Sequence, residues 1–360
     1  MRDLCFTDCV ELVGTSCPPF DGQRQYVSTG AVDVDHISEG DVEVVEYSTK
    51  PSRANLVAEC GDILFAKMQG TKKTLQINST LANNVYSTGF CAVRAKTSVL
   101  TSRCLYHLLT SETFLDQKDK NCSGATQKAI TNAALSKIII NLPDIHLQDG
   151  IADQLDRIAS VISVRQQELQ KLDDLIKARF VEMFGDPIVN SKHLPTIRGD
   201  LFFKLSNGKF VPEEKRFEIG VPVYGGNGIS WYTDEILVDT DTLVVGRVGF
   251  QSGNVHYAKG PLWVSDNAMY ISNYNEKDYD LLFLCHLMEH IDFTRHQDAG
   301  DLKKITQKPF MAMEYIHPSL QQQQEYTTFV QQVDKSKVAV QAALDKAQLL
   351  FDSLMQQYFG

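Results

Sequence analysis

Two stretches of the chain decide its fold: PDIHLQDGIADQLDRIASVISVRQQELQKLDDLIKARFVEMFG (residues 143–185) and PSLQQQQEYTTFVQQVDKSKVAVQAALDKAQLLFDSLMQQYFG (residues 318–360). They align without a gap at an offset of 175 residues, and in both stretches apolar residues recur at alternating steps of four and three. This spacing places the apolar residues along one narrow side of an α-helix, which is the heptad pattern of coiled coils. The sequence therefore predicts two long helices that pair with each other, each ~50–60 Å long at ~1.5 Å per residue.

The apolar seam of these helices has a defined set of members. The predicted seam positions are Ile151, Leu155, Ile158, Ile162, Leu169, Leu172 and Ile176 in the first stretch, and Tyr326, Val330, Val333, Val340, Leu344, Phe351 and Leu354 in the second. Arg165 and Lys337 interrupt the seam, and we expect their stems to pack while their charges reach water. The alternative is two unrelated amphipathic helices that lie in ordinary cores.

The ends of both stretches carry helix start and stop signals. Asp144 and Ser319 each follow a proline, and either side chain can accept a hydrogen bond from the first free amides of a helix. Ser319 and Gln322 have the spacing of a capping box. Gly185 can adopt the left-handed conformation that ends a helix.

The segments that precede the helices have a different texture. Residues 1–142 and 186–317 contain short β-like runs, glycine-rich turns and one helical stretch each, which predicts an α+β fold class. The two segments align loosely: GDILFAKMQG (61–70) with TDTLVVGRVG (240–249), LYHLLTSETF (105–114) with LCHLMEHIDF (284–293), and GATQKAIT (124–131) with GDLKKIT (300–306). We therefore expect four segments, namely a domain at 1–142, a helix at 143–185, a domain at 186–317 and a helix at 318–360.

Composition limits the class of protein. The chain has 360 residues, 22% of them charged and 43% hydrophobic, which is typical of globular proteins. It has no run of 18 apolar residues and no basic leader, and its eight cysteines form no CxxC pair, so we expect a soluble, unexported protein with reduced thiols in a cytoplasm. The net charge is −10 and none of the four segments is basic, whereas a DNA-binding protein that works alone usually has a basic surplus.

Taken together and in this order, the segments resemble a known family. The strings that carry the resemblance are VYGGNGISWYTDEI (223–236), GRVGFQSGNVHYAKGPLWVSDNAMY (246–270) and LIKARFVEMFGDP (175–187), with the strand-and-turn segments before each helix. The chain is similar over essentially its whole length to the specificity (S) subunits of type I restriction–modification systems. This resemblance implies two target-recognition domains of mixed α/β structure separated by two long helices that pair as an antiparallel coiled coil.

The resemblance also implies partners and cofactors. The helices would dock two modification (M) subunits, which bind S-adenosylmethionine and methylate adenine in double-stranded DNA. A restriction (R) subunit would add cleavage driven by ATP with Mg²⁺. This chain itself would bind no cofactor and no metal, would not be an enzyme, and would read two unlike half-sites of one DNA target.

Polar loops supply candidates for base and phosphate contacts. Arg and Lys side chains can bond guanine, Gln and Asn can bond adenine, and glycines let a backbone approach a groove closely. The candidate DNA contacts are Lys67, Gln69, Thr71, Lys72, Lys73, Gln127 and Lys128 in the first domain, and Asn227, Arg247, Gln251, Ser252, Asn254, His256, Lys303 and Lys304 in the second. The alternative for each of these residues is a solvated turn.

Three patterns hint at catalysis and carry less weight. The segment 286–290 fits the HxxEH pattern of one class of zinc hydrolases, but the aligned first half holds no such pair of histidines. The CPPF segment at 17–20 has a cysteine where amino-methyltransferases need a hydrogen-bond acceptor, so we expect a turn there. Asp200, Glu213 and Lys215 only loosely resemble a nuclease triad. Besides DNA reading, the sequence leaves open an interaction scaffold that does not bind DNA, and a small nuclease or methyltransferase.

Overall fold

The computed structural model describes residues 2–298, 300 and 303–360. The chain forms two compact units, unit 1 from Met1–Gln167 with Gln341–Gly360 and unit 2 from Glu168–Val340. The boundaries between the units fall inside the two long helices, so each helix contributes one part to each unit. This division differs from the four predicted segments because each part of a helix packs on its own unit's domain.

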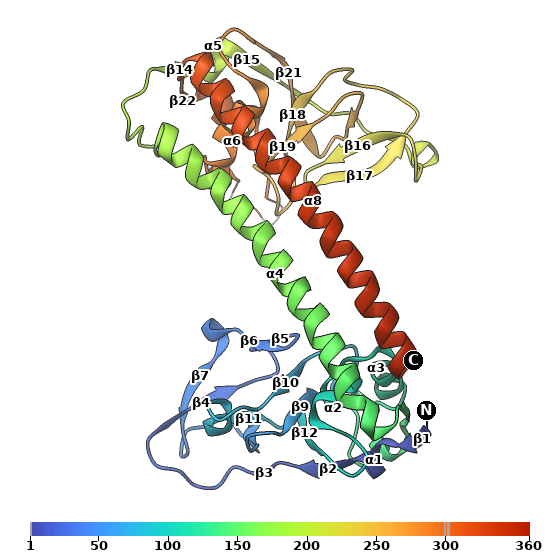
Figure 1. Ribbon diagram of the computed structural model, residues 1–360. Coiled ribbons are helices and arrows are strands. Elements are labelled where there is room, and N and C mark those ends of the chain that lie inside the picture. Colours follow the sequence, from blue (N-terminus) through green and yellow to red (C-terminus); the bar gives the residue numbers. More distant parts are fainter. Residues whose placement is uncertain (1, 299, 301–302) are drawn as a thin grey trace. The chain divides into compact units, whose positions relative to one another are not determined.

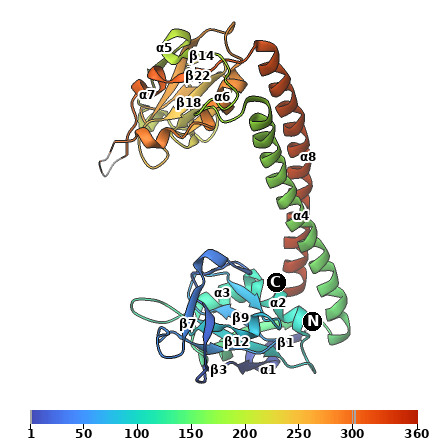
Figure 2. The same ribbon diagram turned by 90° about the vertical axis from the view of Figure 1, so that its left-hand side faces the viewer.

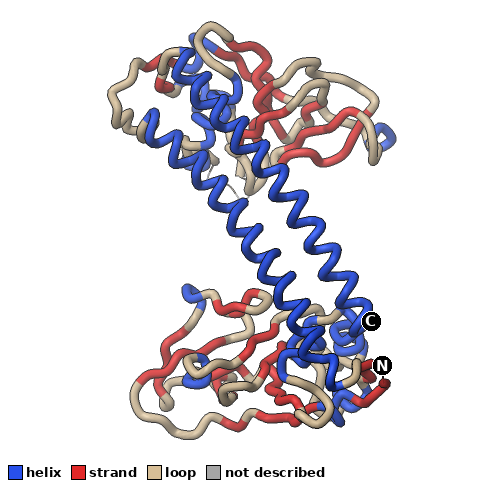
Figure 3. The backbone as a smooth tube through the Cα atoms, viewed as in Figure 1, coloured by secondary structure: helices blue, strands red, loops and turns tan. Residues whose placement is uncertain are grey.

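The two long helices are α4 (Ile145–Phe184) and α8 (Leu320–Phe359), each of 40 residues, which Figure 3 draws in blue. Their predicted ends are confirmed. The Asp144 carboxylate accepts a hydrogen bond from the amide of His146 at 3.0 Å. The side chains of Ser319 and Gln322 bond each other's backbone amides, at 3.4 and 3.2 Å, as in a capping box. Gly185 ends α4 with a left-handed φ of +72°.

Unit 1 contains a mixed domain with two larger sheets, two pairs of strands and several helices, which Figure 1 labels. Its central sheet has the order β10-β9-β12-β2, formed by Thr74–Gln76, Ile63–Ala66, Phe90–Ala95 and Val10–Val13. Its second sheet has the order β3-β8-β11-β4-β7, formed by Thr15–Ser16, Ala54–Val57, Val85–Ser87, Gln23–Val27 and Glu43–Glu46. The other elements are β1 (Arg2–Cys5) paired with β13 (Ile139–Leu142), β5 (Val32–Asp33) paired with β6 (His36–Ile37), α1 (Phe6–Cys9), α2 (Ser102–Thr110), α3 (Glu112–Lys120), η1 (Glu39–Asp41), η2 (Leu81–Asn83) and η3 (Ala134–Lys137).

Unit 2 repeats this plan with fewer strands, and Figure 2 shows its ribbon from another side. Its central sheet has the order β15-β21-β18-β19, formed by Phe203–Asn207, Ala268–Tyr274, Thr242–Gly246 and Val255–Ala258. Its second sheet has the order β17-β16-β20, formed by Gly228–Thr233, Val221–Gly225 and Trp263–Val264. The other elements are β14 (Thr196–Arg198) paired with β22 (Glu314–Ile316), α5 (Gly199–Phe202), α6 (Leu281–Glu289), α7 (Gln307–Ala312), η4 (Glu213–Lys215) and η5 (Phe293–His296).

The two central sheets correspond strand by strand. In both, the strand with a fully buried run, β9 or β18, lies between two antiparallel neighbours. The strand pairing shifts the alignment of residues 61–70 with 240–249 by one residue. Ala66 pairs with Phe90 at the end of β9, and Gly246 pairs with Ala268 at the same place in β18. Lys67 therefore corresponds to Arg247 and not to Gly246. The predicted α+β class with two mixed domains is confirmed.

Each domain core includes both long helices. In unit 1, Ile151 and Leu155 of α4 lie in one hydrophobic cluster with Met355 and Phe359 of α8. In unit 2, the cluster joins the end of α4 to the start of α8, through Ile176, Phe180, Phe184, Tyr326, Val330 and Val333. The start of one helix thus packs beside the end of the other in unit 1, and the reverse holds in unit 2, which is the order of an antiparallel pair.

The ends of the helices depart from the predicted heptad phase. Phe180 and Phe184 follow Ile176 at steps of four and are fully buried, whereas the heptad pattern points to Arg179 and Met183. Met355 and Phe359 of α8 occupy the same positions in the repeat. A straight helix drifts by about 20° per heptad, and here the terminal turns pack on a domain core as well as on the other helix. Lys337 pairs with Asp173 of α4 at 2.6 Å, so its charge stays at the surface of unit 2.

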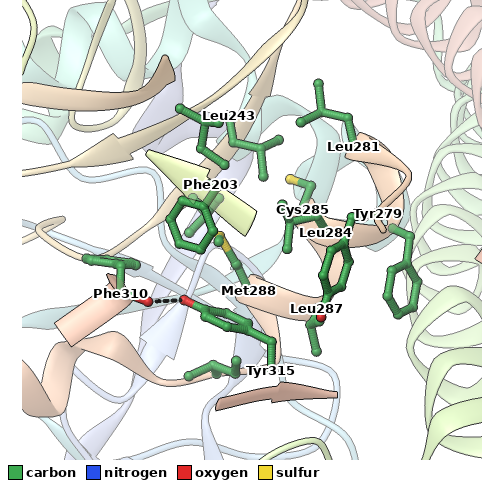
Figure 4. Close-up of a cluster of buried hydrophobic side chains, with 14 of the residues drawn as sticks. Phe203, Leu243, Tyr279, Leu281, Leu284, Cys285, Leu287, Met288, Phe310 and Tyr315 are labelled. Carbon is green, nitrogen blue, oxygen red and sulfur yellow. Dashed lines mark hydrogen bonds between the residues drawn. The ribbon is translucent and has the colours of Figure 1, made fainter. Parts of the chain in front are cut away.

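The core of unit 2 is rich in aromatic and sulfur-containing side chains (Figure 4). Phe203, Leu243 and Cys285 come from two strands and a helix and lie in one cluster. The buried Tyr315 hydroxyl donates a hydrogen bond to the Phe310 carbonyl at 3.0 Å, so its polar atom is satisfied. Burial raises the pKa of the Cys285 thiol well above its usual value.

A buried glutamine joins each long helix to the neighbouring domain. In unit 1, the side chain of Gln148 on α4 is fully buried. Its Oε1 accepts from the amide of Thr101 at 2.9 Å, and its Nε2 donates to the carbonyls of Val99 and Pro143 at 2.9 and 3.1 Å. Thr101 is the N-cap residue of α2. One side chain therefore holds the start of α4 against the start of α2.

Unit 2 makes the same joint with Gln323 of α8, which is also fully buried. Its Oε1 accepts from the amide of Asp280, the N-cap residue of α6, at 2.9 Å. Its Nε2 donates to the carbonyls of Asp278 and Pro318, both at 2.9 Å. Gln148 and Gln323 occupy matching positions of the sequence repeat, and both form the same hydrogen-bonded joint.

Candidate nucleic-acid interface

In unit 1, the structure brings two predicted loops together. Residues 67–73 follow β9, and the amide of Gln69 donates to the carbonyl of Lys128 at 2.9 Å. The amide of Ile130 donates back to the carbonyl of Lys67, also at 2.9 Å. We call residues 67–73 with 124–130 the unit 1 loop pair. It carries all seven of the DNA-contact candidates of the first domain.

The side chains of the unit 1 loop pair divide into outward and inward groups. Gln69, Lys72, Gln127 and Lys128 are exposed, and Lys67 is half-buried. The side-chain amide of Gln69 also donates to the carbonyl of Asp119 at 3.4 Å. The hydroxyl of Thr71 donates to the carbonyl of Met68 at 2.6 Å, and Lys73 Nζ donates to that of Thr29 at 2.8 Å. These last two side chains therefore hold the loop in place.

A residue that the sequence did not single out supports this loop from beneath. Lys118 of α3 is fully buried, and its Nζ donates to the carbonyls of Met68 and Thr71 at 3.1 and 2.7 Å. The carboxylate of the next residue, Asp119, accepts from the amide of Gly70 at 2.9 Å. In the sequence, a lysine near the end of a short polar helix looks like surface charge, so no local signal marks this role.

Unit 2 ties its loops together in the same way. The amide of Gly249 donates to the carbonyl of Lys303 at 2.8 Å, and the amide of Ile305 donates to the carbonyl of Arg247 at 3.0 Å. We call residues 246–256 with 303–305 the unit 2 loop pair. Asn227 lies in the β16–β17 turn, and the ring of His256 is 3.4 Å from the carbonyl of Gly226 in that turn.

The side chains of the unit 2 loop pair differ from those of unit 1. Lys303 and Lys304 are exposed, and Gln251 and Asn254 bond each other through their amides. Arg247 donates to the carbonyl of Asp266 at 3.1 Å. The remaining candidate is Ser252, and its side chain does not reach the surface.

Ser252 packs inside the turn instead. Its exposed fraction is 0%, and its Oγ has no hydrogen-bond partner among the described residues. Its carbonyl accepts from the side chain of Gln297 at 2.7 Å. The exposed residue of this turn is Phe250, which the sequence interpretation passed over although it follows a glycine in a polar loop.

The three patterns that hint at catalysis have ordinary contacts. The ring of His290 stacks on Phe180 at 4.0 Å between centroids, and its Nδ1 donates to the carbonyl of His286 at 2.8 Å. Cys17 is buried, and its thiol is 3.5 Å from the carbonyl of Pro18. The Asp200 carboxylate pairs with Arg198 at 3.1 Å, and Lys215 pairs with Glu235.

The described part of the chain holds neither a cluster of metal ligands nor a membrane-spanning helix. Within residues 2–298, 300 and 303–360, no three His, Cys, Asp or Glu side chains are grouped so that they could hold a metal ion. No helix in the same part is long and apolar enough to cross a membrane.

Comparison with known proteins identifies relatives of the chain. A family model described as "Type I restriction modification DNA specificity domain" matches residues 35–174 and 198–347. The specificity subunit of the type I restriction enzyme HindI from Haemophilus influenzae is 28% identical over 148 residues, which are 40% of this chain and 32% of that protein. A putative type I specificity subunit from Mycoplasma genitalium is 23% identical over 58% of this chain and 56% of its own length. The matches thus span about a third to about half of these relatives.

Solved structures share the fold. The S subunit of a type I restriction–modification system from M. genitalium has a TM-score of 0.64 at 15% identity, covering 100% of this chain and 96% of that chain. A chain from a structure of complex assembly in the type I restriction–modification system has a TM-score of 0.60 at 17% identity, covering 99% and 97%. The family model covers most of the sequence in two separate segments, one for each domain. The chain therefore belongs to the type I restriction–modification DNA specificity family.

Proposed function

We propose that this chain is the DNA-specificity subunit of a type I restriction–modification complex, and that it reads a target of two unlike half-sites. One observation carries the proposal. The same backbone hydrogen bonds fix a loop pair in each unit, at Gln69 and Lys128 in one and at Gly249 and Lys303 in the other, while the side chains presented there differ. Equivalent supports with unlike surfaces suit two readers of two different DNA sequences.

The exposed side chains have the chemistry that such reading needs. Gln69, Gln127 and Asn227 offer amides that can bond adenine, while Lys72, Lys128, Lys303 and Lys304 offer cations for guanine or phosphate. Thr71, Lys73 and Ser252 are engaged or buried, so we assign them to loop support.

The acidic balance supports a role within a complex. The net charge of −10 weakens attraction to the phosphate backbone, so much of the positive field must come from partners. We propose that two M subunits dock on the helical regions, bind S-adenosylmethionine and methylate an adenine in each half-site. Such an enzyme must take the adenine out of the stack, which is work for the partner's active site. An R subunit would use ATP with Mg²⁺ to cleave unmodified DNA. This chain would itself be non-catalytic, and the complex would act in the cytoplasm.

The decisive experiment is to co-express the chain with its M subunits and to map methylated adenines across a genome. We expect a split motif, with two unlike half-sites around a spacer of unspecified bases. A palindromic or continuous motif would contradict the proposal. Methylation by the purified chain with S-adenosylmethionine, in the absence of M subunits, would instead place it among the enzymes.

A further inference from the structure

Phe250 occupies the tip of the unit 2 loop pair. The carbonyl of Gly249 accepts from the amide of Ser252 at 3.0 Å, which closes a tight turn with Phe250 at its second position. The glycines on both sides of the turn, Gly249 and Gly253, have φ values of +91° and +100°. Such values favour glycine, so the turn depends on these two residues. The strands that flank it, β18 and β19, are labelled in Figure 1.

The exposure of Phe250 is unusual for its size. Its side chain is 89% exposed, although phenylalanine is usually among the most buried residue types. The rest of the turn is anchored inward, since Ser252 is fully buried and a Cβ added to Gly253 would lie 3.3 Å from the backbone of Phe293. The fold therefore holds the base of the turn firmly and presents an aromatic ring to solvent.

Cationic residues lie on the two segments of the loop pair that carries this apolar tip. Lys303 and Lys304 are exposed, and the hydrogen bond from Gly249 to Lys303 keeps the two segments adjacent. Arg247 lies three residues before Phe250 on the same loop. Proteins that deform DNA insert apolar side chains between base pairs while nearby cations contact the phosphates. The unit 2 loop pair combines both elements.

We infer that Phe250 is a wedge that inserts between adjacent base pairs of the half-site read by unit 2. This inference rests on the proposed function and deepens it, because it assigns one residue a role in reading by DNA deformation. The equivalent position in unit 1 is Gly70, where an added Cβ would find no atom within 4 Å. Unit 1 has no ring to insert there, so only one of the two half-sites is unstacked by this position.

The test uses the full complex with M subunits and DNA that contains the mapped motif. 2-Aminopurine replaces one base at a time in the half-sites and spacer, leaving the methylated adenines unchanged. We compare wild type with F250A, F250W and the control L201A, since Leu201 is also exposed, at 74%, but lies on α5 of the same unit. Affinity and fluorescence are measured on each duplex.

We expect wild type to raise the fluorescence at one step of the unit 2 half-site, because an unstacked base is less quenched. F250A should lose that rise and bind roughly 5- to 150-fold more weakly, as expected when a base loses an aromatic partner. F250W should keep most of both properties, and L201A should behave as wild type. No step in the unit 1 half-site should depend on residue 250.

Two results would overturn the wedge but leave the proposed function standing. In the first, F250A matches wild type in affinity and in fluorescence. In the second, F250A binds more weakly, but wild type raises the fluorescence at no position of the DNA. In the second case, loss of affinity on replacing one thymine by uracil would identify contact with a methyl group instead. A continuous or palindromic motif from the wild-type complex would overturn the proposed function and the wedge with it.

Discussion

The two units make identical joints and present different surfaces. Gln148 and Gln323 form the same three hydrogen bonds, and one bond of each set joins a long helix to the N-cap residue of a short helix. The loop pairs are also fixed alike, because Lys67 and Arg247 each accept a backbone hydrogen bond from an isoleucine. The contacts that the two loop pairs share are made by backbone groups, so the exposed side chains can differ between the units while these contacts stay the same.

The second sheets show the same division. In unit 1, β4 pairs antiparallel with β7 and parallel with β11, and in unit 2, β16 pairs antiparallel with β17 and parallel with β20. Unit 1 adds β8 and β3 beyond this common part. The shared strands define the frame, and the additions lie at its edge, where a further strand disturbs no existing pairing. Four sets of substitutions test whether the shared frame and the differing surfaces behave as described.

The largest effect is expected at the ends of the long helices. Phe180 is fully buried, with ring centroids of Phe184, His290 and Tyr326 at 5.2, 4.0 and 5.6 Å. Phe180→Ala should destabilise unit 2 by about 3–5 kcal/mol through the cavity it leaves. Met355→Ala, at the matching position of α8, should cost unit 1 less because Met355 is 9% exposed. Hydrogen exchange measured peptide by peptide reports each unit separately. Equal losses in both units after Phe180→Ala would mean that they unfold as one body.

The glutamine joints should respond equally in both units. Gln148→Ala removes the side-chain partner of two carbonyls, one of them buried and one part-buried, and of one amide, which should cost about 2–3 kcal/mol in unit 1. Gln323→Ala should cost unit 2 the same amount. Denaturant unfolding with hydrogen exchange provides the comparison, and Gln154→Ala, at an exposed position of α4, serves as the control. A large difference between the two joints would show that their matching geometry does not carry matching energy.

Lys118, which supports the unit 1 loop pair, allows one loop pair to be weakened while the other is left unchanged. Lys118→Met keeps most of the buried stem but removes two hydrogen bonds and the ion pair with Asp119 from its charged end, which should destabilise residues 67–73 by about 1.5–3 kcal/mol. We expect faster hydrogen exchange in that loop and weaker selection of one half-site by the complex. Lys120→Met, an exposed lysine on the same helix, is the matched control. An equal loss at both half-sites would argue against a separate reader in each unit.

The smallest effect concerns pH. His107 of α2 is 2% exposed, its Nε2 lies 2.7 Å from the Asp156 carboxylate, and its Nδ1 has no partner among the described residues. Burial lowers the pKa of His107, despite the opposing effect of Asp156. Burial opposes ionisation of Asp156, but hydrogen bonds from Arg103 and His107 hold the pKa of that carboxyl below its usual value.

The sign of the pH dependence follows from the lowered pKa. A histidine whose pKa is lower in the folded state stabilises the fold above its unfolded pKa of about 6.5, and this stability is lost as the pH falls. Unit 1 should therefore lose stability between pH 7.5 and 5.5. Asp156 stays ionised in this window, since its pKa is below that of a free carboxyl. His107→Gln should reduce the pH dependence of the free energy of unfolding that hydrogen exchange reports for unit 1. An unchanged slope in this variant would assign the dependence to another group.

The apolar seam of the long helices could be predicted from the sequence in part. The heptad pattern identified buried positions such as Ile151, Leu155, Val330 and Val333, because apolar periodicity is a local property of a helix. It missed Phe180 and Met355, since an idealised repeat assumes that only the partner helix lies opposite. At those turns a domain core lies opposite as well, and that neighbour comes from residues far away in the chain.

The two long helices, their caps and the repeated α+β frame can be predicted from the sequence, because periodicity, capping residues and internal similarity are properties of consecutive residues. Which loop side chains face water depends on the tertiary contacts. Ser252 and Phe250 are two residues apart in one polar loop, yet the first is fully buried and the second is 89% exposed. Lys118 supports a loop about 50 residues earlier in the chain. Burial and support of this kind are set by contacts between distant segments, and no local pattern encodes them.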